Sequence, residues 1–303
     1  MNVLLVDVDS KIPNYALMKI AAYHRAIGDN VGFNVGDPGK VYASVVFRKN
    51  RHKVDGLRFL YPDADIDIGG TGYDIHKVLP EEIDRQSPDY SIYPECDRFL
   101  GFTSRGCIRN CPFCYVPRKE GKFRRIYDSA KEALDHIVGD HVGRWRQIEL
   151  LDNNILADKE WFMEVSQEIM DRGWKVDFNQ GLDIRLLDVE IACRLAELRP
   201  IIDWKFAFDN TNYEKAVMDG IDLLNANGVD VRHKCLFYVY CDGDHQYEDA
   251  VYRCRRLKER NALAYVMMNA DNNNTKRTRA LKRWTRPQIF WTVDIDDYKK
   301  VRV

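Results

Sequence analysis

The sequence contains no long hydrophobic run, and its charges nearly cancel. No stretch approaches the roughly 18 consecutive apolar residues of a membrane-spanning helix, so we expect no membrane partner. The 46 basic and 47 acidic residues give a formal net charge of -1. A chain without overall positive charge offers no general attraction to nucleic acid or to an acidic membrane, so any contact with a polyanion has to be local.

The start of the chain lacks the long apolar segment of a signal peptide. Residues 2–7 form a short apolar run that ends at Asp7, and this pattern predicts a first strand. Eight cysteines in 303 residues do not indicate a disulfide scaffold, and the first of them is Cys96. We therefore expect reduced thiols and a cytoplasmic protein.

The first 80 residues alternate short apolar runs with helical patterns. This alternation predicts an α/β fold that begins with a small, open, parallel sheet of the Rossmann-like kind over residues 1–80. Residues 81–96 are polar and include Pro88 and Pro94, which predicts a linker. The expected strands are 2–7, 31–33, 41–47 and 65–73, and the expected helices are 16–24 and 54–60.

From residue 97 onward the alternation continues through six strand-helix units. Such a series predicts a partial (β/α)6 barrel of the TIM type over residues 97–270, followed by a basic C-terminal extension, 271–303. The chemistry of such barrels lies at the carboxyl ends of the strands. The expected strands are 99–103, 147–151, 175–178, 203–208, 229–240 and 262–268.

Three cysteines stand close together in a loop marked by glycine and proline. Cys107, Cys111 and Cys114 could direct their thiolates at one soft metal centre, and thiolates favour iron-sulfur clusters and zinc. Three ligands would leave one iron of a four-iron cluster open to an outside ligand. The alternatives are a zinc site or cysteines without metal. Structural zinc wants four ligands, and no second cysteine pair stands nearby.

The spacing Cys107-x3-Cys111-x2-Cys114, with Phe113 before the last cysteine, resembles the signature of the radical SAM superfamily. The resemblance implies that the three cysteines hold a 4Fe-4S cluster whose free iron binds S-adenosylmethionine. Reductive cleavage would yield methionine and a 5′-deoxyadenosyl radical that abstracts hydrogen from a substrate. An external electron donor of the flavodoxin or ferredoxin type is implied. The alternative is a non-enzymatic zinc or iron-sulfur module that binds a partner through the basic C-terminal segment.

The layout is similar to the radical SAM branch with an N-terminal cobalamin-binding-like domain. The strand-first start and the Gly69-Gly70 turn match that branch. Asp74-Ile75-His76 is the nearest approach to the cobalt-ligating histidine element, but Leu79 stands where a glycine is expected. A cobalamin-dependent radical SAM methyltransferase is therefore an alternative function. Cobalamin is possible but not favoured as a cofactor, because a turn that needs a positive φ also explains the glycines.

Polar residues follow the expected barrel strands, and the resemblance assigns them to S-adenosylmethionine. Each has a structural alternative: a turn or helix start for the first two, a salt bridge with Asp183 or Asp188 for the arginine, and a helix cap for the last aspartate. An aromatic residue beside the cluster would shield it or touch adenine. The candidate cofactor-binding residues are Phe113, Tyr115, Asp152, Asn153, Arg185 and Asp209.

Two features have no assigned role. Cys241 follows a strand and could face the cavity as a hydrogen donor or extra ligand. The basic segment 276–286 is interleaved with Trp284 and followed by Trp291, a pattern compatible with phosphate contacts and base stacking, so nucleic acid is one candidate substrate. A solvated helix face is the alternative. The sequence names neither the substrate nor a catalytic residue.

Overall fold

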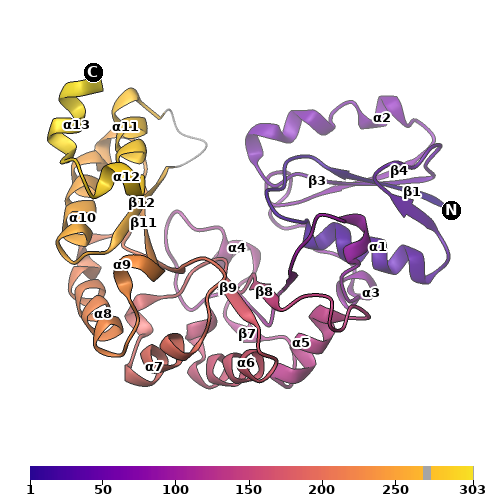
Figure 1. The fold of residues 1–303 in the computed structure, drawn as a ribbon. Helices are drawn as coiled ribbons and strands as arrows, with labels where there is room; N and C mark the ends of the chain where they lie inside the picture. The colour runs from indigo at the N-terminus through magenta and orange to yellow at the C-terminus, as the bar shows by residue number, and fades with distance from the viewer. Residues whose placement is uncertain (269–273, 303) are drawn as a thin grey trace. The chain divides into compact units, whose positions relative to one another are not determined.

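The computed structural model describes residues 1–268 and 274–302, without the side chains of 299–302. It is a mixed α/β structure with parallel sheets, which confirms the predicted class, and it divides into two compact units, Met1–Arg146 and Gln147–Val303 (Figure 1). Residues 81–96, predicted as a linker, lie inside the first unit. The expected junction between barrel and C-terminal extension, at residues 270 and 271, lies outside the described residues.

The first unit is built on the predicted parallel sheet. Its four strands are hydrogen-bonded in the order β2-β1-β3-β4, and every neighbouring pair is parallel. Helix α1 covers one face of the sheet, and the helical segments η1 and α2 cover the other (Figure 1). The central strands β1 and β3 have buried residues on both faces, which is typical of parallel sheets. The strands are β1 (Asn2–Asp7), β2 (Asn30–Gly32), β3 (Lys40–Ser44) and β4 (Asp65–Gly69).

The carboxyl edge of this sheet is fixed by one asparagine. Asn14 caps α1 (Tyr15–Ala26) by accepting a hydrogen bond from the Leu17 amide at 3.2 Å. Its side-chain amide donates to Ser10 Oγ at 2.9 Å and to Ser44 Oγ at 2.8 Å. A buried polar side chain with all of these partners stabilises the edge, because none of its groups is left unsatisfied.

The expected helix at 54–60 is wrong in its form. The chain makes a 3₁₀ segment, η1 (Arg48–Val54), and then a separate turn of helix, α2 (Leu57–Leu60). Gly56 stands at the break, where its low helix propensity favours an interruption. The rest of the first unit comprises α3 (Glu81–Asp84), η2 (Tyr90–Ile92), β5 (Phe99–Gly101), β6 (Ser104–Arg105), α4 (Val116–Lys119), β7 (Arg124–Arg125) and α5 (Ala130–Val138).

The second unit continues the strand-helix alternation. β8 and β9 pair in parallel, and β10, β11 and β12 form a parallel three-stranded sheet. The strands are β8 (Gln147–Leu150), β9 (Lys175–Phe178), β10 (Trp204–Ala207), β11 (Cys235–Cys241) and β12 (Leu263–Met268). The helices that follow them are α6 (Lys159–Asp171), α7 (Val189–Glu197), α8 (Glu214–Ala226), α10 (Tyr247–Glu259) and α11 (Lys276–Trp284). The shorter helices are η3 (Ile155–Ala157), η4 (Ile184–Leu186), η5 (Thr211–Tyr213), α9 (Val231–Lys234), η6 (Asp244–Gln246), α12 (Pro287–Phe290) and α13 (Ile295–Arg302).

Irregular backbone joins β9 to β10. Val176 donates its amide to the Arg199 carbonyl and accepts from Ile201, both at 2.9 Å, and Leu182 donates to the Lys205 carbonyl at 2.7 Å. A buried ion pair crosses the same gap, with Lys205 Nζ 2.5 Å from Asp177 Oδ2. The two groups of strands are therefore neighbours without a regular ladder between them.

The expected strand at 229–240 begins later than predicted. Asp230 caps the short helix α9 by accepting a hydrogen bond from the His233 amide at 3.2 Å, and β11 starts only at Cys235. The cap satisfies an amide that a strand would have to pair elsewhere, so it overrides the β-branched residues Val229 and Val231. No helix among the described residues is long and apolar enough to cross a membrane.

Candidate functional site

The three cysteines lie on the loop between β6 and α4. The Cys114 amide donates to the Cys111 carbonyl at 3.0 Å, which closes a tight turn. The Cys107 sulfur accepts from the Arg109 amide at 3.3 Å, and the Cys114 sulfur accepts from the Val116 amide at 3.4 Å. Amide groups directed at sulfur are one of the ways in which proteins tune iron-sulfur clusters. The backbone therefore already offers contacts that suit a thiolate ligand.

The three thiols form no disulfide, are partly buried and share one loop. No three His, Cys, Asp or Glu side chains within residues 1–268 and 274–302 are grouped closely enough to hold a metal ion. The chemistry of the donor set nevertheless fits an iron-sulfur cluster, since three thiols stand at short intervals with amides directed at two of them. A ligand set of this kind assembles as the metal binds.

A short hairpin closes the base of the cysteine loop. β6 and β7 pair antiparallel, and the Cys107 amide donates to the Gly121 carbonyl at 3.2 Å. Gly106, just before the first cysteine, has φ +81° and leaves so little space that an added Cβ would lie 2.2 Å from the Lys122 carbonyl oxygen. Only glycine fits such a position, because a side chain would meet both backbone strain and overlap.

The cysteine loop is tied to the turn that follows β4, within the same unit. Lys119 Nζ donates to Thr71 Oγ1 at 2.6 Å, and burial lowers the pKa of Lys119. The glycines of this turn also serve the protein's own packing. A Cβ on Gly70 would meet the Val45 backbone, and one on Gly72 would meet the Phe47 backbone. The turn after β4 is therefore closely packed against the backbone that follows β3.

The two aromatic candidates stand on the surface of the loop. Phe113 is 38% exposed and Tyr115 is 47% exposed. The guanidinium of Arg118 lies 5.1 Å from the centre of the Tyr115 ring. Both rings are accessible, and their contact with a cofactor stays a prediction.

The ends of β8 and β9 carry a connected polar network. Asp152 is buried and Asn153 is partly buried after β8. Asn179, after β9, donates to Glu149 Oε1 at 2.5 Å. Asn154 donates to Asp183 Oδ2 at 3.5 Å. These contacts hold polar groups of two neighbouring strands at one edge, where the sequence predicts cofactor contacts.

Arg185 makes the salt bridge that the sequence leaves open as an alternative. Its Nε lies 2.6 Å from Asp183 Oδ1 and its Nη2 lies 3.0 Å from Asp183 Oδ2, a two-point pair. The guanidinium also lies 4.5 Å from the centre of the Tyr213 ring. Asp183 and Tyr213 fix the orientation of Arg185, and a grip on a methionine carboxylate stays a prediction.

Asp209 is held by the adjacent strand. Its Oδ1 accepts the Tyr240 amide at 2.9 Å. Burial raises the pKa of Asp209, and the hydrogen bond from Tyr240 and the charges of Arg253 and Arg185 oppose that rise. The charge of Arg185 thus acts on Asp209, and the contact of either residue with a cofactor stays a prediction.

Arg253 is the residue that sequence analysis missed. This fully buried side chain of α10 donates from Nη1 to the Phe208 carbonyl at 2.6 Å and from Nη2 to the Tyr240 carbonyl at 2.9 Å. Its Nε donates to Asp249 at 2.8 Å. Arg253 thus clamps the carboxyl ends of β10 and β11 beside Asp209. The signal was its place on the apolar face of the helix, between Ala250 and Cys254.

Cys241 does not lie open to a cavity. It is fully buried, its Sγ donates to the Gly243 carbonyl at 3.5 Å, and burial raises the pKa of the thiol. A buried neutral thiol is inert, which does not support the idea that Cys241 acts as a hydrogen donor or extra ligand.

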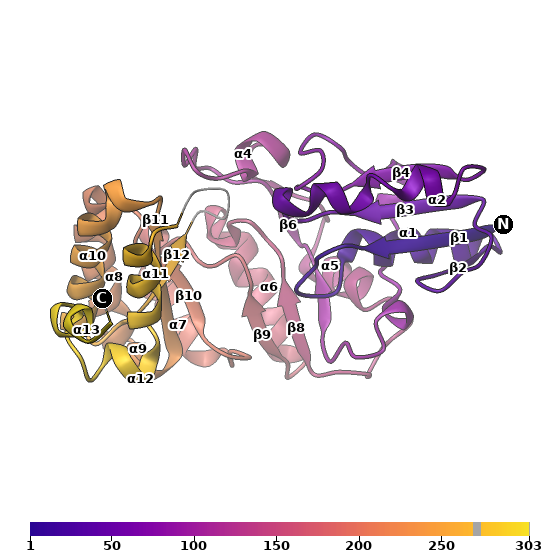
Figure 2. The same cartoon turned by 90° about the horizontal axis from the view of Figure 1, so that it is seen from above.

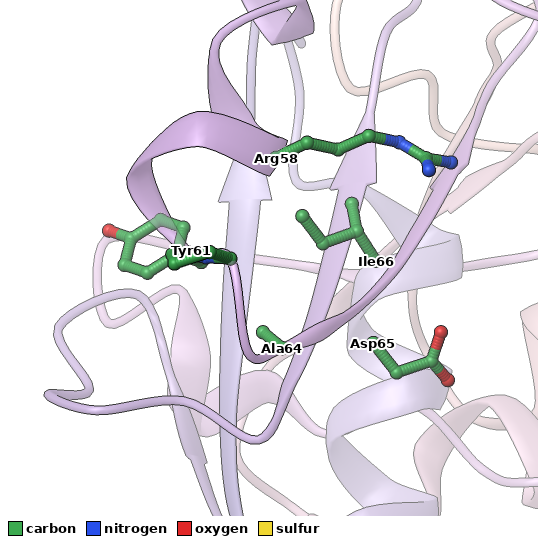
Figure 3. Close-up of a pocket in the computed structure, with 6 residues that line it drawn as sticks. Arg58, Tyr61, Ala64, Asp65 and Ile66 are labelled. Carbon is green, nitrogen blue, oxygen red and sulfur yellow. The ribbon is translucent and has the colours of Figure 1, made fainter.

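A separate cavity of 220 Å³ lies in the first unit, at the start of β4. Arg58 extends over Ile66 there, and Tyr61 and Asp65 border the opening (Figure 3). Open α/β sheets bind ligands at the carboxyl ends of their strands. This cavity is at the amino end of β4 and holds no predicted site residue, so we assign it no role.

The tight packing at Gly106 generates a prediction for the cysteine loop. We expect Gly106→Ala to lower the free energy of unfolding by about 2–5 kcal/mol, through left-handed backbone strain and overlap with Lys122. Gly121→Ala is the matched control, because Gly121 has φ +76° but open space around its Cα. It should cost only about 1–2 kcal/mol. Urea unfolding of both variants measures the difference, and equal losses would contradict the close contact.

The raised pKa of Asp209 generates a second prediction. Between about pH 4 and its raised pKa, the unfolded carboxyl ionises more readily than the folded one, so the wild-type protein loses stability as the pH rises. Asp209→Asn keeps an acceptor for Tyr240 and removes this loss. The variant should therefore gain stability relative to wild type as the pH rises from 4 to 8, as measured by urea unfolding.

Asp230→Asn is the control of opposite sign. The hydrogen bond with His233 lowers the pKa of Asp230, so its charge stabilises the fold above the ordinary aspartate pKa and this contribution is lost as the pH falls. Asp230→Asn should lose stability relative to wild type at pH 7. The same pH trend in both variants would refute the burial of Asp209.

Comparison with known proteins finds similarity among solved structures. No protein-family model matches the sequence, and no curated protein does. A solved structure of TsrM from Kitasatospora setae, a radical S-adenosylmethionine methyltransferase with cobalamin and a [4Fe-4S] cluster bound, matches with a TM-score of 0.65. Identity is 12%, over 88% of this chain and 74% of that one. The match shows a shared fold, and it does not support the expectation that cobalamin is the less favoured cofactor.

Proposed function

We propose that the chain is a radical SAM enzyme. The observation that carries this proposal is the loop with Cys107, Cys111 and Cys114, closed by the β6–β7 hairpin, in a chain that shares its fold with a radical SAM methyltransferase. When bound to these thiolates, a 4Fe-4S cluster would supply the electron that cleaves S-adenosylmethionine to methionine and a 5′-deoxyadenosyl radical. Hydrogen abstraction from a substrate follows in this proposal. A cluster of this kind requires reduced thiols, so the cytoplasm is the proposed compartment.

The proposed scaffold is a partial (β/α)6 barrel over residues 97–270. The five parallel strands β8 to β12, each followed by a helix, support it. Polar residues at the ends of barrel strands are where such folds place their chemistry. The proposed domain bounds are those of the sequence: 1–80, 81–96, 97–270 and 271–303.

The proposed cofactor contacts follow from the chemistry of the strand-end residues. The carboxylate of Asp152 and the amide oxygen of Asn153 would accept hydrogen bonds from the methionine ammonium. Asp209 would accept from a ribose hydroxyl. Arg185, held in place by Asp183, would add a positive charge for the methionine carboxylate. A flavodoxin or ferredoxin is the proposed electron donor.

Removal of one cysteine tests the proposal. After anaerobic reconstitution with iron and sulfide, the wild-type chain should bind about four irons and form 5′-deoxyadenosine with a strong reductant. Cys111→Ala should lose most of the iron. Its rate of 5′-deoxyadenosine formation should fall at least about 100-fold, which corresponds to an increase of about 2.7 kcal/mol or more in the activation free energy. Iron analysis and chromatography measure both quantities.

Cys193→Ala is the control, because Cys193 is an exposed free thiol on α7. It should leave both quantities unchanged. Cleavage that survives in Cys111→Ala would refute the ligand assignment. One tightly held zinc per chain without any 5′-deoxyadenosine would favour the non-enzymatic metal module instead.

Cobalamin-dependent methyl transfer is the second candidate. Two observations favour it: the matching methyltransferase structure has cobalamin bound, and Lys119, just after the cysteine loop, contacts the turn at the carboxyl edge of the parallel sheet in the same unit. Ligands of open parallel sheets bind at that edge. These residues fit a corrin only in part, because Gly70 and Gly72 already pack against the protein's own backbone at Val45 and Phe47.

Titration with hydroxocobalamin tests this second candidate. If the carboxyl edge binds the corrin, the visible absorption should shift and saturate at one equivalent per chain. The double variant Thr71→Lys with Lys119→Thr keeps the composition but places a charged chain in the turn, and should weaken binding about tenfold. An unchanged spectrum at millimolar hydroxocobalamin would exclude cobalamin and leave the radical SAM proposal intact.

A further inference from the structure

One face of the β10–β11–β12 sheet is only partly covered by the residues that the structure describes. Alternate residues of β11 are buried against helices, while Leu236, Tyr238 and Tyr240 between them are only partly buried. The strand register places Ala207, Tyr238 and Tyr265 side by side across the three strands. Such neighbours stand on the same face of a sheet, about 5 Å apart. A small residue thus adjoins two aromatic ones in a single row.

One aromatic side chain of this row is exposed, and the other, Tyr238, is half-buried. Tyr265 is 37% exposed, and Met267, on the same face of β12, is 44% exposed. The rings of Tyr238 and Tyr265 meet edge to face, with centroids 5.8 Å apart. Because the side chain of Ala207 is short, the flank of Tyr238 is not covered by β10. Large apolar side chains gathered on an open face indicate a binding surface.

Helix α11 sets positive charge beside these rings. It packs against β12 (Figure 1 and Figure 2), and Lys282 Nζ lies 5.2 Å from the centre of the Tyr265 ring. Its buried side consists of Thr278, Leu281 and Trp284, and its sequence contains no acidic residue. The basic residues in and directly after this helix are Lys276, Arg277, Arg279, Lys282, Arg283 and Arg286.

Among the described residues, one of these basic side chains has an acidic partner within ion-pair distance. Arg277 pairs with Glu248. In the part of the chain that the structure describes, Lys276, Arg279 and Arg286 form no ion pair, and all three are exposed. The chain as a whole is nearly neutral, so this helix is a local concentration of positive charge. A polyanion is the partner that such a surface attracts.

The tryptophans of the basic segment are not the stacking residues. Trp284 is fully buried and its Nε1 donates to the Val293 carbonyl at 2.9 Å. Trp291 is partly buried, with the Arg232 guanidinium 4.6 Å from its ring centre. The accessible rings beside α11 are therefore the tyrosines of β11 and β12, which come from sequence segments distant from the tryptophans.

We propose that this surface binds a single-stranded nucleic acid, with bases against Tyr238, Tyr265 and Met267 and phosphates against α11. Aromatic rings stack on unpaired bases and cations track the backbone, which is the combination found in single-strand binding sites. A duplex hides its bases from such rings. The nine residues of α11 span about 13 Å, more than the phosphate of one nucleotide needs. Binding of the strand does not depend on the cluster. The further step, in which the bound strand is the substrate of the radical, rests on the proposed function.

Fluorescence anisotropy of the full chain with a labelled 20-nucleotide RNA of mixed sequence tests the proposal. The RNA should bind, and an unlabelled mixture of the four nucleoside monophosphates at equal nucleotide concentration should not displace it. Tyr265→Ala should weaken binding about tenfold through lost stacking. Lys276→Ala with Arg279→Ala should lower the slope of log Kd against log salt by about 1.4, at about 0.7 for each lost phosphate contact.

Matched controls separate this surface from general charge and general aromatic contacts. Tyr252→Ala removes an exposed tyrosine from α10, and Lys215→Ala removes an exposed lysine from α8, and neither should change Kd. Thermal melts confirm that each variant is folded. Absence of RNA binding at low salt, equal affinity for a duplex, or equal losses in the controls would each overturn the proposal. Loss of Cys111 should leave Kd unchanged, so failure of the cluster chemistry is distinguishable from failure of this binding.

Discussion

The closure of the cysteine loop is the constraint on which the proposed chemistry depends. Three thiols can serve one cluster only if the chain returns on itself within a few residues. The β6–β7 pairing brings the two ends of the loop together, and Gly106 passes against the Lys122 carbonyl with no room for a side chain. Lys119 then joins the loop to Thr71 in the turn after β4. The segment proposed to bind the cluster is therefore an integral part of the first unit.

The sequence predicted those parts of the fold that depend on local rules. Asp158 and Asp188 cap α6 and α7, which follow β8 and β9 as the predicted strand-helix alternation requires, because a cap needs only the side chain and the next few amides. The same rule, unnoticed at Asp230, delays β11. The irregular join between β9 and β10 depends on the long-range pair of Lys205 with Asp177, which no local pattern carries.

The candidate site residues come from the sequence and their roles stay predictions, whereas the side chain that supports Asp209 was not predicted. Asp209 and Arg185 were read from their positions after strands. Arg253 was not, because an arginine in a charged helix is ordinarily solvated. Its burial is tolerated because the Phe208 and Tyr240 carbonyls and Asp249 satisfy its donors.

The aromatic residues near the basic segment are not those that the sequence suggests. In the sequence, its lysines and arginines surround Trp284. The spacing of Thr278, Leu281 and Trp284 nevertheless places that ring on the buried side of α11. Packing a helix beside an edge strand brings its exposed charges to the residues of that strand. Tyr265 therefore lies beside Lys282 of this helix, and the packing of α11 against β12 brings aromatic and basic side chains together that the sequence separates.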